Sequence, residues 1–135
     1  MTAIAQSKAT DWQPWLAAGG RVFLAAIFII SGISKLGDPA GTAGYIASVG
    51  IPAPMVAAWG AIAIELVGGV ALIAGYRVRI TALALALFSL ATALLFHNDF
   101  ADQMQSIMFM KNIAIVGGLL QVMAFGAGRY GIDRS

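Results

Sequence analysis

The sequence has no cysteine and very little charge. Without thiols the chain cannot form disulfides, iron–sulfur clusters or thiolate metal sites. Only 10% of the 135 residues are charged and 60% are hydrophobic, whereas soluble domains carry about 25% charged residues. So little charge cannot cover the surface of a soluble domain, and the high apolar content also excludes a disordered chain.

Basic residues and histidine are scarce as well. Eight Lys and Arg residues against six Asp and Glu residues leave a net charge of +2, and no basic cluster is present, so we expect no nucleic-acid partner. The single His excludes a haem held by two His residues of one chain. We expect no metal site either, because the only ligand set would combine His97 with Glu65 and Asp99 or Asp102.

Long apolar runs are what the sequence does have. Each is close to the roughly 20 residues that a helix needs to cross a bilayer. The runs cover residues 14–35, 54–75, 80–97 and 106–125. They predict an all-α fold, a polytopic four-helix bundle in the lipid bilayer, with a membrane domain over 14–127 and tails at 1–13 and 128–135. A cleaved signal peptide is the alternative for the first run, but Arg21 interrupts its apolar core.

The charges in the tails and connections predict an orientation. Basic residues mark the cytoplasmic side of a membrane protein. They fall in the two tails and the second connection, whereas Asp residues occupy the first and third connections. The basic residues are Lys8, Arg77, Arg79, Arg129 and Arg134. The pattern predicts a multi-pass protein of the bacterial inner membrane with both termini in the cytoplasm.

The first connection is long enough for structure of its own. Asp38 and Pro39 form a helix-start pair, and Gly50 with Pro52 forms a stop signal. We expect a short interfacial helix between the first two spans that acts as a partial lid. A plain glycine-rich loop is the alternative.

Small residues recur in the spans at the spacing of helix contacts. Helices in lipid associate by close backbone approach, which glycine permits. The expected packing positions are Gly32, Gly68, Gly69, Gly117 and Gly118. Leu87 and Leu119 are expected to face lipid.

Polar side chains at membrane depth are costly and are candidates for function. The candidates for a ligand site or polar network are Arg21, Lys35, Glu65, His97, Lys111 and Asn112. Glu65 lies near the middle of the second run and needs a partner from another span. Lys111, Arg21 and His97 are the candidates, and similar depth favours Lys111. The network either holds the bundle together or forms a ligand site in its outer half.

With these residues in place, the chain resembles the DoxX family of small membrane proteins. The resemblance rests on residues 21–39 (RVFLAAIFIISGISKLGDP), 50–52 (GIP), 65–69 (ELVGG), 96–97 (FH) and 111–118 (KN-x-A-x-x-GG). It implies a four-helix membrane fold. The family's name comes from a subunit linked to quinone-dependent thiosulfate oxidation, and other members are linked to membrane redox complexes. No catalytic residue carries over from it.

We therefore expect an accessory subunit of a membrane redox system, or a subunit that binds a quinone or another small ligand such as a small acid. A quinone fits as a ligand, with no covalently bound cofactor, and any enzymatic role would be within a quinone-linked oxidoreductase. Another membrane or periplasmic redox subunit, or a second copy of the chain, would be a compatible partner. The alternatives are a non-catalytic structural or assembly subunit and, ranked last for lack of inverted repeats, a small-solute transporter.

Overall fold

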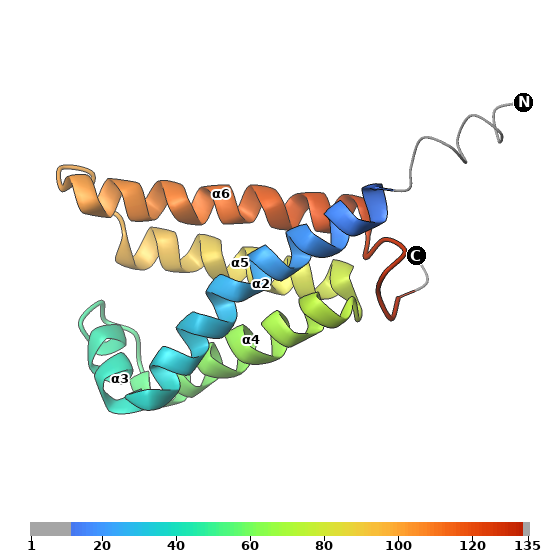
Figure 1. Ribbon diagram of the computed structural model, residues 1–135. Coiled ribbons are helices and arrows are strands. Elements are labelled where there is room, and N and C mark those ends of the chain that lie inside the picture. The colour runs from blue at the N-terminus through green and yellow to red at the C-terminus, as the bar shows by residue number, and fades with distance from the viewer. Residues whose placement is uncertain (1–11, 134–135) are drawn as a thin grey trace, which may run out of the picture.

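A computed structural model describes residues 12–133 and confirms the all-α architecture (Figure 1). The helices are α2 (Gln13–Gly37), α3 (Pro39–Ala47), α4 (Pro54–Ala74), α5 (Val78–Phe96) and α6 (Gln103–Phe125). All of them except α3 are long and apolar enough to cross a membrane. The predicted spans agree with these helices to within a few residues. Lys8 and Arg134, used in the orientation argument, lie outside the described residues.

The short helix α3 confirms the prediction for the first connection, and the glycine-rich loop is wrong. Pro39 stands at its first position, and the Asp38 carboxylate accepts a hydrogen bond of 2.9 Å from the backbone N–H of Gly41. This side chain satisfies one of the free N–H groups at the helix start. Ile46 of α3 is buried against Ala58 of α4, so α3 packs on the bundle.

The spanning helices form two closely packed pairs. α2 packs along α4, α5 packs along α6, and α4 adjoins α5. α2 is strongly tilted. Figure 1 shows it beginning beside the C-terminal end of α6 and ending beside α3 and α4. The two pairs are therefore close together at the end of the bundle where the described chain begins and finishes, and they separate toward α3.

Glycines set the close approaches between helices. A Cβ added at Gly32 would lie 2.8 Å from the Leu66 side chain, and one at Gly69 would lie 2.5 Å from Ile29 Cγ1. A Cβ added at Gly68 would lie 2.9 Å from the Leu85 side chain, and one added at Gly118 would lie 3.0 Å from the Leu24 side chain.

Two of the expected packing assignments are wrong. Gly117 has nothing within 4 Å of an added Cβ, so it does not pack against a neighbouring helix. Leu119 is fully buried in the core, whereas Leu87 is 59% exposed. α6 is therefore rotated from the assumed orientation, with Gly118 and Leu119 on its inner side.

The chain after α6 folds back onto the bundle. The backbone N–H groups of Ile132 and Asp133 donate to the carbonyls of Ala74 and Gly75, at 3.0 and 2.8 Å. The Asp133 carboxylate then accepts hydrogen bonds from the N–H groups of Arg77 and Val78, at 2.6 and 2.8 Å. It thus caps the start of α5, and part of the predicted C-terminal tail is a packed segment.

These contacts lower the pKa of Asp133 below its ordinary value. The Val78 N–H bond is the largest cause, and the Arg77 N–H bond and the charges of Arg21 and Arg77 act in the same direction. Partial burial opposes them. These hydrogen bonds and positive charges stabilise the ionised carboxylate relative to the neutral acid.

Candidate ligand-binding site

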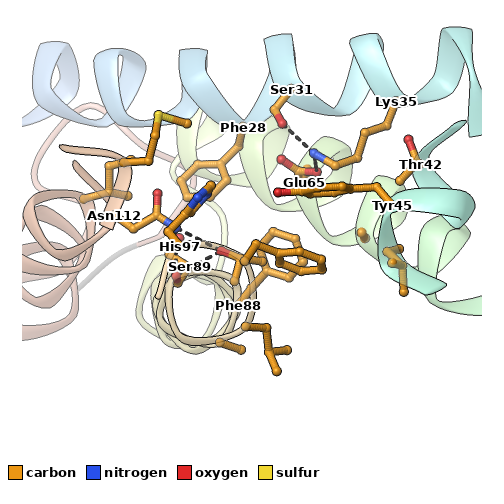
Figure 2. Close-up of a pocket in the computed structure, with 18 of the residues that line it drawn as sticks. Phe28, Ser31, Lys35, Thr42, Tyr45, Glu65, Phe88, Ser89, His97 and Asn112 are labelled. Carbon is orange, nitrogen blue, oxygen red and sulfur yellow. Dashed lines mark hydrogen bonds and ion pairs between the residues drawn. The ribbon is translucent and has the colours of Figure 1, made fainter. Parts of the chain in front are cut away.

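A cavity of about 400 Å³ lies between the two helix pairs, on the side where they separate (Figure 2). Its lining comes from α2, α3, α4, α5 and α6. This volume falls within the range of small-molecule sites in proteins. The tilt of α2 creates the space, because this helix follows α4 instead of α6 at its C-terminal end.

Aromatic side chains form much of the cavity wall. Phe28 of α2 is 4% exposed and belongs to the bundle core, and Phe88 of α5 lines the cavity beyond it. Tyr45 of α3 stacks on Phe96 of α5, with ring centroids 4.9 Å apart and planes 21° apart. This stack joins the short helix to α5 across the separation between the pairs. α3 thus has the position of a lid, and the aromatic walls suit a flat ring.

One wall carries an ion pair. Lys35 Nζ lies 2.7 Å from Glu65 Oε1 and 2.6 Å from Ser31 Oγ, as Figure 2 shows. The Glu65 side chain is 4% exposed and that of Lys35 is 28% exposed. Glu65 Oε1 has no partner in hydrogen-bond geometry within residues 12–133, so the contact with Lys35 is a charge pair with poor direction. The pair links α2 to α4.

The predicted pairing of Glu65 with Lys111 is therefore wrong. The backbones of α4 and α6 do not pack against each other within the described chain, and no Lys111 nitrogen lies within 4.0 Å of a Glu65 carboxylate oxygen, although the two residues are at similar depth. α2 approaches α4 closely at Gly32, where an added Cβ would lie 3.3 Å from Glu65 Cβ. Lys35 follows Gly32 by three residues and reaches back to the carboxylate.

The opposite wall holds an amide and two hydroxyl residues. Asn112 Nδ2 of α6 donates to the Ser89 carbonyl oxygen and to Thr92 Oγ1 of α5, each at 3.0 Å. Asn112 is 8% exposed, and the bonds tie α6 to α5. Its amide oxygen accepts no side-chain hydrogen bond from the described residues, so it is available to a ligand.

His97 and Lys111 complete the polar lining. His97 Nδ1 lies 2.9 Å from Gln105 Oε1. With this amide oxygen as its partner, Nδ1 is the donor, which leaves Nε2 as the acceptor in the neutral form of the ring. Lys111 is partly buried and has no acidic partner within 4.0 Å among residues 12–133.

The structure thus places five of the six candidate polar residues around one cavity. They are Lys35, Glu65, His97, Lys111 and Asn112. Ser89, Thr92 and Gln105 also take part, and the sequence analysis missed them. Ser89 and Thr92 could have been noticed, because they are hydroxyl residues one turn apart in the outer half of an apolar run. No group of three or more His, Asp or Glu residues in 12–133 could hold a metal ion.

Arg21 does not belong to this cavity, contrary to its place in the predicted network. It is 2% exposed at the other end of the bundle. Its guanidinium donates to the carbonyls of Leu72 and Ile73, at 2.6 and 3.1 Å, and to that of Tyr130. A cation at the C-terminal carbonyls of a helix is favourable. Arg21 therefore joins α2, the end of α4 and the returning C-terminal segment.

The sequence model of the DoxX family matches residues 16–98, which include most of α2, all of α3 to α5, and the cavity residues Lys35, Glu65 and His97. This chain belongs to the DoxX family. It is similar to the inner membrane protein YqjF of Escherichia coli (strain K12), with 42% identity over 114 residues, 84% of this chain and 86% of YqjF. It is also similar to the inner membrane protein YphA of the same strain, with 32% identity over 127 residues, 90% of this chain and 91% of YphA. No solved structure matches. The DoxX-family chain is an integral membrane protein.

Proposed function

We propose that this DoxX-family protein binds a quinone headgroup, or a ring of similar size, as an accessory subunit of a membrane redox system. The observation that carries the proposal is the 400 Å³ cavity with aromatic walls and polar groups on two opposite sides. A purely structural subunit would need the ion pair and the packing glycines, but it would not need this space.

The polar groups suit the two carbonyl oxygens of a quinone ring. An ammonium group has three donors. Lys35 donates one of them to Ser31 and forms a charge pair, without hydrogen-bond geometry, with Glu65. Lys35 therefore keeps a donor for one carbonyl. Lys111, on the α6 side of the cavity, offers donors for the other carbonyl. Glu65 and His97 are groups that can accept or release a proton as a quinone is reduced or oxidised.

The accessory role follows from what this chain supplies. It has no cysteine for thiol redox chemistry, so electrons would pass between a bound quinone and a partner subunit. The chain's own residues would bind and orient the ring and hold the proton.

We propose that both ends of the chain lie in the cytoplasm and that the cavity lies in the periplasmic half of the bilayer. The start of α2 and the C-terminal segment lie at the same end of the bundle (Figure 1). The rings of Trp15 and Tyr130 are 4.5 Å apart there. The cavity, with α3 and His97, is toward the opposite end.

A transporter path has no support. Arg21 is buried between α2 and the C-terminal end of α4, at the end of the bundle near the termini.

A second candidate function has one observation in its favour. The Lys35–Glu65 pair and the Asn112 bonds each join two helices within the chain. A non-catalytic assembly subunit would use these bonds only to hold its own helices in register.

Replacing either of two alanines on α4 with leucine distinguishes the ligand-binding function from the assembly function. Ala61 lines the cavity, whereas Ala63, two residues on, is exposed on the outer face. We expect mass spectrometry of gently purified protein to find a bound quinone in the wild type and in Ala63→Leu, and to find little in Ala61→Leu, where the larger side chain fills the cavity. Equal quinone content in the two variants, or none in the wild type, would contradict quinone binding in this cavity and favour the assembly subunit.

A further inference from the structure

The charges around the cavity do not balance. The titratable side chains that line it are Lys35, Glu65, His97, Lys111 and Tyr45. Lys35 and Glu65 neutralise each other at 2.7 Å, and the tyrosine and a neutral imidazole add no charge. Lys111 therefore leaves the site with one net positive charge.

No acidic side chain in the described chain is placed to neutralise Lys111. The nearest in sequence on the same side are Asp99 and Asp102, in the connection before α6. Each carboxylate is bound to backbone instead, Asp99 to the N–H of Ala101 at 3.2 Å and Asp102 to the N–H of Met104 at 2.9 Å. Neither lies within 4.0 Å of a Lys or Arg nitrogen in residues 12–133.

The position of Lys111 makes the missing counter-ion costly. It lies eight residues into α6, about 12 Å along the helix axis from Gln103. Met108 and Ile115, three residues before it and four residues after it on α6, also line the cavity. An ionised group at membrane depth is expected to have a partner, and a cation facing an apolar cavity is best satisfied by an anion inside it.

We infer that the ring bound in this cavity carries an ionised acidic oxygen and that Lys111 is its counter-ion. The inference rests on the proposed ligand-binding function and narrows it from any quinone-sized ring to an anionic one. The aromatic walls hold the ring, Lys111 pairs with the charged oxygen, and a donor of Lys35 that is not bonded to Ser31 binds a neutral oxygen on the opposite side.

An anion could reach Lys111 from a second direction. Lys111 also borders a shallow groove on the outer surface of α6, with Gln103, Ser106, Ile107 and Met110. A lipid phosphate in this groove would be the same chemistry from a different source. The experiment must therefore separate a ring in the cavity from a headgroup at the surface.

The test uses two rings of nearly the same shape. One is 1,4-naphthoquinone, which is neutral, and the other is 2-hydroxy-1,4-naphthoquinone, which is ionised at neutral pH. Affinities are measured by calorimetry on the full chain in a non-ionic maltoside detergent. We expect the ionised ring to bind more tightly by about 30-fold or more, the lower end of the effect of a buried charge pair.

Substitutions then assign the preference to Lys111. Lys111→Gln should remove it, Lys111→Arg should keep it, and Arg129→Gln, which removes an exposed charge outside the cavity, should leave it unchanged. The measurement is repeated in nanodiscs of phosphatidylglycerol. A preference that persists there supports a ring in the cavity, and one that disappears shows that a lipid phosphate is the counter-ion and overturns the inference.

The outcomes for the inference and for the proposed function differ. If both rings bind with equal affinity to the wild type, the ligand is not selected for charge, and the inference fails while ring binding stands. If neither ring binds, ring binding itself fails and the inference falls with it. A preference that survives in Lys111→Gln would also overturn the role of Lys111.

Discussion

Lys35 of α2 and Glu65 of α4 form an ion pair of 2.7 Å. Within residues 12–133, no other Lys or Arg nitrogen lies within 4.0 Å of an acidic side chain. The Glu65 side chain is almost completely buried, and Lys35 is partly exposed at the cavity. Gly32 makes the contact possible, because a side chain at that position would meet Leu66 and hold the helices apart. The pair therefore depends on close packing of α2 and α4.

The first prediction concerns the energetic coupling of this pair. Lys35→Met alone leaves a buried carboxylate without its cation, and we expect it to lower the free energy of unfolding by about 3 kcal/mol. The double variant with Glu65→Gln should be less destabilised than the sum of the single variants. The measurement is a double-mutant cycle from denaturation in detergent.

Lys111 provides the matched control for that cycle. Because Lys111 forms no ion pair with Glu65 within 4.0 Å, Lys111→Met and Glu65→Gln should have additive effects. Coupling in this second cycle, or additivity in the first, would show that Glu65 is paired differently in the membrane.

The second prediction compares neighbouring glycines on α6. Leucine at Gly118 would push against Leu24, and we expect Gly118→Leu to destabilise the protein by about 1–3 kcal/mol. Gly117 has open space around it, so Gly117→Leu should be neutral or slightly stabilising, since leucine favours a helix more than glycine does. Thermal denaturation of the purified variants measures the difference. Equal effects at the two positions would mean that α6 is rotated from the orientation described.

The third prediction concerns the pH dependence of the C-terminal cap. The folded pKa of Asp133 is below its ordinary value of 3.8, so its contribution is fully present above that value. It is lost as the pH falls through the lower, folded pKa, because the carboxylate must then be protonated. We expect Asp133→Asn to be less stable than the wild type near neutral pH, and the difference in melting temperature to shrink as the pH falls below about 4. A difference that stays constant down to pH 3 would argue against a carboxylate cap.

The fourth prediction tests the orientation in the membrane. Reporter domains fused after Gly50 and after Ala101 should be periplasmic, because both positions lie in connections on the acidic side. A fusion at the end of the chain should be cytoplasmic. Cytoplasmic signal from either of the first two fusions would reverse or break the proposed topology.

Much of the architecture followed from local sequence features. Apolar runs of bilayer length predicted the four spanning helices, and the Asp38–Pro39 start signal predicted α3, because length, hydropathy and helix caps depend on residues close together in the chain. Lys35, Glu65, His97, Lys111 and Asn112 could be chosen as candidates for the same reason, since the cost of a polar group in lipid depends mainly on its depth.

Neighbours in space were decided by the tertiary structure alone. Depth along the membrane suggested Lys111 as the partner of Glu65, but α2 lies beside α4 and α6 does not, so Lys35 forms the pair. Arg21 is, like Lys35, a basic residue of α2. The tilt of α2 nevertheless places Arg21 against the end of α4 and the returning C-terminal segment. The sequence by itself determined which residues cross the membrane and which of them are costly to bury. Helix tilt and rotation, which arise from packing between segments far apart in the chain, decided which costly residues meet and where a cavity remains.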